Sequence, residues 1–512
     1  MTMKVSPILT ESPSSRMEEA LFRSARNFPQ KIALSHSGGS LDYTEFARTA
    51  RGLAATLRSR GVVGGDRVAT FLDKTPEAAV ALFGIWSAGA VAVPINEGLR
   101  SAQVKHILAD SGARVLISHA RKLASLEEGT VDGVSTLDFE IRNQELPSAE
   151  GSSRAFPGGN EPAIILYTSG STGLPKGILI SHDNLLAGSR IVSNYLGLQH
   201  DERILSVLPF SFDYGLNQLL TAVDLGATLF LQRSMLPADI CRSLEEREIT
   251  GLAGVPTLWY QLMSDATPLE GKRFPKLRYI TNSGGVFPVE LVRRYRERLP
   301  HVRIFLMYGL SEAFRSTYLP PDQIDVRPSS MGKAIPETEI LVIDAEGKEC
   351  GPDEVGELVH AGPTVSLGYW NRPESTQAVF RPHPLRPNEP RPAVYSGDMV
   401  KRDADGYLYF VGRRDQQIKT SGFRVSPEEV EQAIYRSGLV SEVVVRGEPD
   451  EMLGQVIIAH VLPRDRQAFS TRELEDYCVR EMPRYMVPKR VLVHESFPRT
   501  SSGKVDRKRV GA

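Results

Sequence analysis

The sequence predicts an α/β protein with a large N-terminal domain of mostly parallel, helix-covered sheets and a small α+β C-terminal domain. The chain has 512 residues, too many for one compact core, so two or more domains are expected. Short β-branched runs alternate with helical patterns through the first three-quarters of the chain, as in parallel sheets. Past about residue 415 this alternation gives way to a compact pattern of capped helices and strands.

The elements of the large domain can be taken in order. Strands are predicted at residues 67–72, 114–118, 163–167, 203–208, 228–231 and 303–307, with helices at 43–60, 238–247 and 289–298. The uncharged stretch 78–95 is at the lower length limit for a membrane span. It contains Gly84, Gly89 and Pro94, so we expect a helix followed by a strand, both buried. Loops are predicted at 151–162, rich in Gly, Ser and Pro, and at 381–392, which holds five prolines.

Two helix starts define the small domain. Ser426 and Glu429 form a capping-box pattern with proline at the first helical position, and Gly438 ends that helix. Ser470 and Glu473 repeat the pattern for a second helix. Strands are predicted between them at residues 442–446 and 455–461.

Composition narrows the class of protein. Lys plus Arg number 61 against 62 for Asp plus Glu, so the chain has no basic field for nucleic acid or anionic lipid. The cysteines Cys241, Cys350 and Cys478 are far apart, which argues against a disulfide framework or a zinc site. Residues 1–16 are polar and lack a signal-peptide core. We therefore expect a cytoplasmic enzyme with no membrane span; the oligomeric state stays open.

The strongest motif is the loop from Tyr167 to Gly177, which lies between two predicted strands. The hydroxyls are those of Thr168, Ser169, Ser171 and Thr172, the glycines are Gly170 and Gly173, and the positive charge is that of Lys176. Such glycines let backbone N–H groups close on phosphate oxygens, while hydroxyls and a lysine add further donors. A flexible connector is the alternative, but it seldom carries a single lysine between strands. The spacing G-x-x-G-x-x-K-G is not that of a Walker loop, so the motif predicts a different phosphate-binding loop.

The loop resembles the signature of the adenylate-forming superfamily, which includes acyl-CoA synthetases, nonribosomal adenylation domains and luciferases. Further motifs follow in the family's order, at residues 308–312, 395–398, 412–415 and 502–504, so the resemblance covers nearly the whole chain. It implies a large domain at residues 1–414 that includes a β-barrel-like part. It also implies a small mobile domain at residues 415–512, with its hinge at Asp415.

The resemblance implies that the nucleotide is ATP. Glu312 would hold Mg²⁺ on the phosphates, a role that suits a hard oxygen ligand. Asp398 would accept hydrogen bonds from both ribose hydroxyls, and Arg413 would contact the nucleotide. Further residues implied at ATP are Gly284, Gly285, Tyr308, Gly309 and Ser311. Ser311 stands where the family usually has threonine, and the hydroxyl is kept. A plain turn is the alternative for the two glycines at 284–285, and a turn residue is the alternative for Asp398.

Lys504 is implied to be the catalytic lysine, with Glu312 and Arg413 assisting. Its charge would bridge the carboxylate and the α-phosphate while an acyl-adenylate and pyrophosphate form. Rotation about Asp415 would then remove it and present Lys419 and Gly422 beside a tunnel for a thiol. The chain ends shortly after Lys504, so we expect that thiol to come from coenzyme A or from the phosphopantetheine of a separate carrier protein.

The identity of the acid stays open. Residues implied at the acyl group are Phe212, Asp213, Ser283, Met307 and Arg315. Asp213 could pair with the ammonium of an amino acid, cap a helix starting near Gly215, or be neutralised by Arg315. We favour an acyl-CoA synthetase for a small or medium acid. The alternatives are a stand-alone amino-acid adenylating enzyme serving a carrier protein and a non-catalytic nucleotide-binding homologue.

Overall fold

The computed structural model describes residues 16–141, 158–168, 175–263, 269, 272–414, 418–420, 423–450, 454–482, 486–500 and 503–511. Within these ranges, no helix combines the length and the apolar character that crossing a membrane requires.

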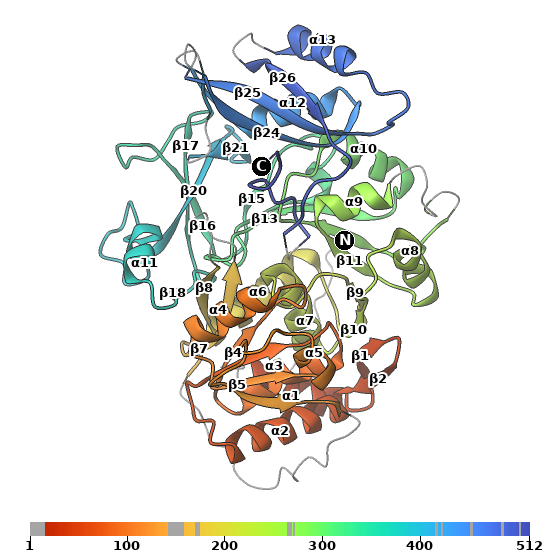
Figure 1. Cartoon of the computed structure of the whole chain (residues 1–512), viewed down its shortest axis with the longest axis vertical. Coiled ribbons are helices and arrows are strands. Elements are labelled where there is room, and N and C mark those ends of the chain that lie inside the picture. The colour runs from red at the N-terminus through yellow and green to blue at the C-terminus, as the bar shows by residue number, and fades with distance from the viewer. Residues whose placement is uncertain are drawn as a thin grey trace, which may run out of the picture.

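Two mostly parallel sheets form the frame of the N-terminal part (Figure 1). The nine-stranded sheet has the order β15-β14-β13-β12-β11-β9-β10-β1-β2 and is antiparallel only at β2, β14 and β15. Its strands are β1 (Ile32–His36), β2 (Gly39–Asp42), β9 (Arg203–Ser206), β10 (Thr228–Leu231), β11 (Gly251–Gly254), β12 (Tyr279–Asn282), β13 (Arg303–Tyr308), β14 (Thr317–Leu319) and β15 (Lys333–Ala334).

The seven-stranded sheet has the order β18-β8-β7-β4-β3-β5-β6 and is antiparallel only at β8 and β18. Its strands are β3 (Arg67–Phe71), β4 (Val91–Pro94), β5 (Val115–Ser118), β6 (Ser135–Asp138), β7 (Pro162–Thr168), β8 (Lys176–Ser181) and β18 (Gly368–Tyr369). Neighbouring parallel strands place their carboxyl ends on one edge, where open α/β sheets bind ligands.

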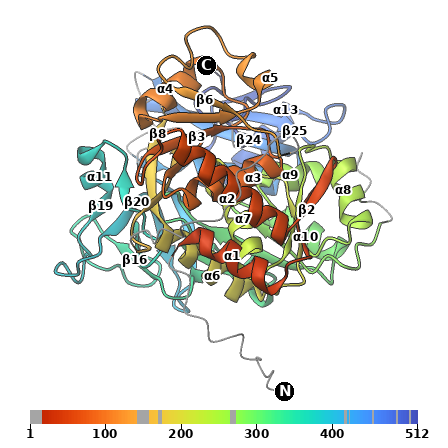
Figure 2. The same cartoon turned by 90° about the horizontal axis from the view of Figure 1, so that it is seen from below.

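Helices fill the space between the two sheets and cover their outer faces (Figure 2). The central helices are α1 (Met17–Asn27), α2 (Tyr43–Ser59), α3 (Pro76–Ser87), α6 (His182–Leu196) and α7 (Asp213–Leu225). The outer face of the nine-stranded sheet carries α8 (Pro237–Glu246), α9 (Pro256–Leu262) and α10 (Val289–Arg298), and that of the seven-stranded sheet carries α4 (Ser101–Ser111) and α5 (Ala120–Leu123). A short 3₁₀ turn, η2, spans Pro321–Gln323.

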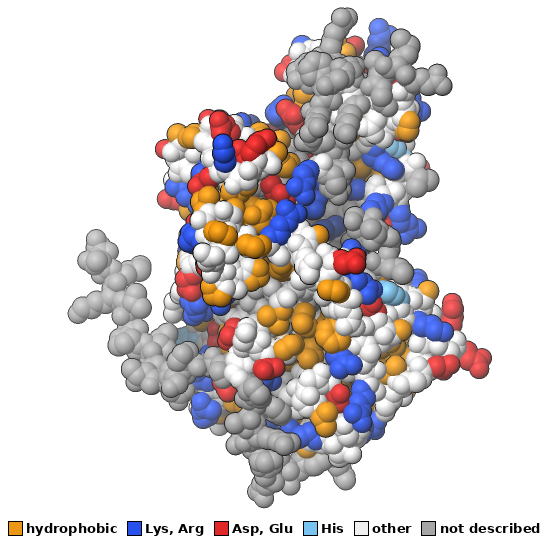
Figure 3. Space-filling view, turned by 90° about the vertical axis from the view of Figure 1, so that its left-hand side faces the viewer, with side chains coloured by type: hydrophobic (Ala, Val, Ile, Leu, Met, Phe, Trp, Pro, Cys, Tyr) orange, Lys and Arg blue, Asp and Glu red, His pale blue; other side chains and the backbone are white. Residues whose placement is uncertain are grey.

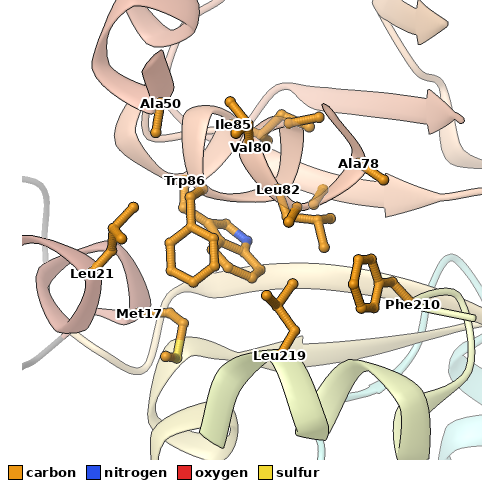
Figure 4. Close-up of a cluster of buried hydrophobic side chains, with 14 of the residues drawn as sticks. Met17, Leu21, Ala50, Ala78, Val80, Leu82, Ile85, Trp86, Phe210 and Leu219 are labelled. Atoms are coloured by element: carbon orange, nitrogen blue, oxygen red, sulfur yellow. The ribbon is translucent and has the colours of Figure 1, made fainter. Parts of the chain in front are cut away.

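The largest core lies in this central helical layer (Figure 4). Trp86 of α3 is fully buried there, with Met17 and Leu219 from α1 and α7 nearby. Its Nε1 donates a hydrogen bond to the carbonyl of Ala163 in β7, 2.8 Å away. The Trp86 indole therefore joins a helix to a sheet, and its own buried N–H is paired.

A third, antiparallel sheet of five strands follows within the predicted large domain, and its strand order is open. Its strands are β16 (Glu339–Ile343), β17 (Val355–Ala361), β19 (Phe380–Arg381), β20 (Ala393–Arg402) and β21 (Leu408–Arg413), with α11 (Pro373–Val379) beside them. Asp398 of β20 lies opposite Arg413 of β21 in the strand register. Figure 3 shows this side of the molecule, where hydrophobic side chains are exposed among charged ones.

The last part of the chain forms a separate five-stranded sheet with two helices, which we call the C-terminal module. Its elements are β22 (Ile418–Thr420), β23 (Phe423–Val425), α12 (Pro427–Arg436), β24 (Val440–Asp450), β25 (Gly454–Pro463), α13 (Thr471–Glu481) and β26 (Arg490–Val493). Ser426 and Ser470 cap the two helices as predicted, each accepting a hydrogen bond from the backbone N–H three residues on. The module has its own core.

The predicted elements agree with the structure to within a few residues. The helix at 289–298 and the strand at 228–231 have the predicted bounds. The stretch 78–95 holds most of α3 followed by β4, both buried, and is not a membrane-spanning helix. Residues 382–392 carry no helix or strand and are mostly exposed, whereas most of the predicted loop 151–162 lies outside the described residues.

Candidate active site

The predicted phosphate loop is described only at its two ends. Ser169, Gly170, Ser171, Thr172 and Gly173 lie outside the described residues. Thr168 ends β7 and lies opposite Lys176, the first residue of β8, in the antiparallel register. The loop between them thus leaves and re-enters the seven-stranded sheet at one edge, so its two ends are held by neighbouring strands.

Lys176 and Glu312 both lie near the ring of Tyr369, which the sequence did not single out. The Nζ of Lys176 is 6.0 Å from the ring centroid. The Tyr369 hydroxyl donates a 2.6 Å hydrogen bond to Oε1 of the half-buried Glu312. Burial, followed by the nearby charge of Glu312, raises the pKa of Tyr369, so the phenol stays a neutral donor. The tyrosine orients the carboxylate that is predicted to hold Mg²⁺.

A single carboxylate fits Mg²⁺ in this position. Across the described ranges, no three His, Cys, Asp or Glu side chains gather closely enough to form a metal site of their own. Magnesium in nucleotide-dependent enzymes is commonly held by one or two carboxylates together with substrate phosphates. The donor that the chain offers beside its phosphate loop, Glu312, therefore suits an ion that arrives with ATP.

Tyr308, Asp398 and Arg413 form a second cluster where β13 meets β20 and β21. The Tyr308 hydroxyl donates to Oδ2 of Asp398, and Nη1 of Arg413 lies 3.1 Å from Oδ1. Oδ1 is buried and accepts no hydrogen bond from the described residues. Burial raises the pKa of Asp398, and the Arg413 charge opposes that shift. A buried acceptor with spare capacity is what a hydroxyl donor would complete.

The turn after β12 brings Gly284 against the C-terminal module. Gly284 has φ of +80°, and a Cβ there would lie 2.8 Å from Cε of Lys504. The positive φ favours glycine, and a Cβ would displace the end of the lysine side chain. A Cβ on the neighbouring Gly285 would lie 3.0 Å from Cγ of Pro256. Next to them, Ser283 is buried at the carboxyl end of β12. The group that approaches Gly284 in the structure is the lysine, and the approach of ATP to these two glycines stays a prediction.

Lys504 follows the C-terminal module in the chain but contacts residues of the N-terminal part. Its Nζ is 4.9 Å from the ring centroid of Phe212. Burial lowers the pKa of Lys504, and the charge of Asp213 opposes that shift. The structure therefore brings the tail lysine, Phe212, Asp213 and Gly284 together, although they are far apart in the sequence.

The lysine is carried on a hairpin that we define as residues 499–507, of which 501 and 502 are outside the described ranges. Its ends pair through an isolated bridge between Arg499 and Val505. The backbone N–H of Thr500 donates to the Lys504 carbonyl at 2.7 Å. The hydroxyl of Thr257 in α9 reaches the Gly503 carbonyl at 3.4 Å. The lysine hairpin is thus a defined turn that rests on α9.

Two buried carboxylates anchor the lysine hairpin inside the C-terminal module. Arg499 Nη2 donates to Oε1 of Glu442 in β24 at 2.6 Å. Arg507 makes a two-bond pair with Glu431 of α12, with Nη1 to Oε2 at 2.9 Å and Nη2 to Oε1. Such fork-to-fork pairs fix orientation as well as adding energy. The lysine is therefore flanked on both sides by arginine anchors.

Arg315 and Asp213 form a buried pair beside the predicted acyl position. Nη1 of Arg315 donates to Oδ2 of Asp213 at 3.4 Å and to the Phe314 carbonyl at 2.6 Å. The capping alternative for Asp213 is wrong, because α7 begins at Asp213 and its N-cap residue, Phe212, makes no capping hydrogen bond. Met307 is buried in β13 and accepts a 3.0 Å hydrogen bond on Sδ from the Tyr195 hydroxyl.

For the remaining predicted residues, the structure gives few contacts or none. Gly309 packs behind the loop, where a Cβ would lie 3.2 Å from Cα of Arg315. Ser311 is half-buried in the same loop. The backbone of Lys419 lies in β22, opposite Arg424 of β23. Asp415 and Gly422 are outside the described residues, so the hinge and the thiol tunnel stay predictions.

Three groups in the site carried no sequence signal. Tyr369 meets Glu312 across 57 positions of sequence, and Arg507 meets Glu431 across 76. Thr257 reaches Gly503 across 246 positions. A lone tyrosine, arginine or threonine matches no motif by itself, and only the folded register brings each to its partner.

Comparisons with known proteins converge on one family. A family model described as AMP-binding enzyme matches residues 21–370, and one described as AMP-binding enzyme C-terminal domain matches residues 429–504. Feruloyl-CoA synthase of an Amycolatopsis species is 33% identical over 490 residues, which cover 94% of this chain and 96% of that protein. Tyrocidine synthase 3 of Brevibacillus parabrevis is 31% identical over 489 residues, which cover 94% of this chain but 7% of that much longer protein.

Among solved structures, the chain is similar to o-succinylbenzoate coenzyme A synthetase of Bacillus subtilis in complex with ATP and magnesium ion. The TM-score is 0.83 at 27% sequence identity, and the match covers 96% of this chain and 99% of the other.

Proposed function

The chain belongs to the AMP-binding enzyme family, and from this we propose that it is an AMP-forming acid–thiol ligase that uses ATP, Mg²⁺ and coenzyme A. The observation that carries the proposal is the position of Lys504. It reaches the Gly284 turn and Phe212 from the C-terminal module. Glu312 lies in the loop after β13, the neighbour of β12, and Asp398 of β20 accepts a hydrogen bond from Tyr308 at the end of β13. A positive charge there serves the adenylation step.

In the first step, the substrate carboxylate attacks the α-phosphorus of ATP and pyrophosphate leaves with the bonding electrons. A carboxylate is ionised at neutral pH, so no general base is needed. Lys504 stabilises the negative charge that shifts between carboxylate, α-phosphate and leaving group. Bound Mg²⁺ supplies further charge on the phosphates, and Glu312 would hold it. Asp398 would accept hydrogen bonds from the ribose hydroxyls, while Tyr308 and Arg413 hold its carboxylate in place.

In the second step, a thiol attacks the acyl carbonyl, AMP leaves and a thioester forms. We propose coenzyme A as the thiol and a small or medium carboxylic acid as the substrate. Residues 1–414 would form the large domain and 415–512 the small one, turning about Asp415 so that Lys419 and Gly422 flank the thiol. The three free, buried cysteines are consistent with a cytoplasmic location.

A second candidate is an amino-acid adenylating enzyme that loads a separate carrier protein. It is supported by Asp213, a buried carboxylate close enough to Lys504 to affect its pKa and able to pair with a substrate ammonium. The pairing of Asp213 with Arg315 weakens this support, because one cation already meets that carboxylate.

Pyrophosphate exchange into ATP across a panel of fatty, aromatic and amino acids tests both candidates. Exchange with non-amino acids, followed by thioester formation on free coenzyme A, supports the first. Exchange only with amino acids, lost in Asp213→Ala, supports the second. Lys504→Ala should abolish exchange, while Lys508→Ala, four residues along and exposed, should leave it near the wild-type rate. Failure of every acid to drive AMP formation would refute the family-based proposal for this chain.

A further inference from the structure

Arg315 is a buried cation, and only one of its three side-chain nitrogens donates a hydrogen bond within the described residues. Its side chain is 2% exposed, in the loop between β13 and β14. Only Nη1 is engaged, with the Phe314 carbonyl at 2.6 Å and Asp213 at 3.4 Å. Nε and Nη2 have no hydrogen-bond partner among the described residues. Buried donors are almost always paired, and charged donors left unpaired are the most costly.

The two unpaired groups lie on one edge of the guanidinium plane. Nε–H and Nη2–H point in parallel, and this edge of an arginine binds both oxygens of a carboxylate in a fork-to-fork pair. The rings of Tyr214 and Phe314 hold the plane, at 5.1 Å and 5.2 Å from Cζ. The fork is therefore fixed in orientation before any ligand arrives.

A further donor lies on the adjoining helix. Asn217 is one turn beyond Asp213 on the same face of α7, and its buried Nδ2 also lacks a partner among the described residues. It lies 3.7 Å from the Cβ position of Gly188, which the Phe314 ring also contacts. Arg315 and Asn217 thus both lie near Phe314, and Nε and Nη2 of the first and Nδ2 of the second lack acceptors among the described residues.

The charges beside this fork select among the classes of acid. Asp213 lies between two cations, Lys504 and Arg315, and contacts Arg315 through one long hydrogen bond. In the proposed reaction, Lys504 stabilises the charge at the carboxylate that attacks ATP. An alkyl tail would bury the fork unpaired, and an ammonium would be repelled by it. A hydroxyl or a ketone offers a single neutral oxygen to the two N–H groups, whereas a carboxylate offers one charged oxygen to each.

We propose that the acid activated by this enzyme carries a second carboxylate, which the Nε/Nη2 edge of Arg315 binds. The inference rests on the proposed ligase function and names its substrate class. Whether the substrate also carries an amino group for Asp213 is a separate feature of the same chemistry, and the test below distinguishes the two kinds of diacid.

The test is pyrophosphate exchange with acids matched in length. Glutarate is compared with pentanoate, adipate with hexanoate, terephthalate with benzoate, and L-glutamate with L-norvaline. We expect kcat/KM at least tenfold higher for the diacid in at least one pair. A preference confined to glutamate assigns Asp213 to the ammonium, and a preference among the unaminated pairs assigns it to Arg315 alone. Either supports the second carboxylate.

Variants then locate the preference. Arg315→Met should reduce the diacid-to-monoacid ratio to below threefold, and Arg315→Lys, which keeps the charge without the fork, should give an intermediate ratio. Arg190→Met removes an exposed arginine that pairs with Glu337 and should leave the ratio unchanged. If Arg315→Met does not fold, the wild-type panel still decides.

Two results would overturn the inference. If the monoacid is preferred in every pair, the Nε/Nη2 edge of Arg315 does not bind a substrate carboxylate. The ligase assignment would then stand without a second carboxylate. A diacid preference that survives in Arg315→Met would place recognition elsewhere. Absence of exchange with every acid would remove both the inference and the proposed function.

Discussion

Replacing Arg507 by methionine should slow adenylation while leaving the thioester step unchanged. Arg507 does not reach the predicted substrate position; it holds the lysine hairpin through its two-bond pair with Glu431. The hairpin is needed only while Lys504 lies beside Phe212 and Gly284. Loss of the anchor therefore affects the step in which the lysine takes part.

The contacts set the size of the effect. Removing one partner of a fully buried ion pair costs roughly 3–5 kcal/mol. The Glu431 side chain is 8% exposed but that of Arg507 is 35% exposed, so solvent screens part of the interaction. We expect the variant to lose about 2–3 kcal/mol of this interaction energy. If the whole loss destabilises the conformation in which Lys504 lies beside Phe212, the exchange rate falls by at most about 30- to 150-fold.

The pH dependence gives a sharper test. Burial raises the pKa of Glu431 to about 7, and Arg507 opposes that shift. Below that pH the carboxyl is protonated and makes little use of the arginine charge. Above it, the ionised carboxylate depends on Arg507. The wild-type-to-variant ratio should therefore be small at pH 6 and largest at pH 8.5.

The assay compares two half-reactions. Exchange of pyrophosphate into ATP reports adenylation, and thioester formation from a synthetic acyl-adenylate and coenzyme A reports the second step. Arg509→Met, an exposed arginine two residues along, is the matched control. The reasoning fails if Arg507→Met slows both half-reactions equally, or if its defect is the same at pH 6 and pH 8.5.

Three further predictions concern the nucleotide side of the site. Burial lowers the pKa of Lys504 from its usual 10.5. Because the protonated lysine is needed, the exchange rate should fall with rising pH before an ordinary lysine would titrate. Lys504→Arg should remove this alkaline fall from the pH–rate profile. Gly284→Ala should reduce exchange at least tenfold, since its Cβ would meet Lys504, whereas Gly438→Ala, with φ of +72° and nothing within 4 Å of its Cβ, should cost only about 1–2 kcal/mol of stability in urea unfolding. Asp398→Ala should raise the KM for ATP roughly 10- to 100-fold, as expected for lost charge-assisted hydrogen bonds of about 1.5–3 kcal/mol, and an unchanged KM would remove Asp398 from the ribose.

Much of the fold could be predicted because apolar periodicity and capping are local. The capped helices at Ser426 and Ser470, and the helix–strand pair within residues 78–95, depend on neighbours within a few positions. Strand ends were less exact: the run 203–208 is apolar to its end, but β9 stops at Ser206. There the chain turns toward α7, and the Pro209 carbonyl lies 2.2 Å from where a Cβ on Gly215 would be. Such a tertiary approach leaves no local pattern.

The candidate site divides in the same way. Motifs singled out Glu312, Asp398 and Lys504; the structure has Glu312 in the loop after β13, Asp398 within β20 and Lys504 in the lysine hairpin. The partners that orient these residues were out of reach, because Tyr369, Glu431 and Thr257 belong to no motif. Neutralisation of Asp213 by Arg315 could be raised from the sequence as one of three alternatives. Only the packing of the β13–β14 loop against the start of α7 shows the 3.4 Å contact between them.

The anchors of the lysine hairpin have a consequence for turnover. Both arginine pairs lie within the C-terminal module, whereas the Thr257–Gly503 hydrogen bond, the stacking of Tyr260 on Tyr435 (ring centroids 6.1 Å apart) and the approach of Lys504 to Phe212 join the module to the rest of the chain. A module that withdraws would break contacts of the second kind and keep both arginine pairs, so the lysine would leave with its anchors intact. Each return would then be a docking event rather than a folding event, so repeated cycles need not rebuild the catalytic arm.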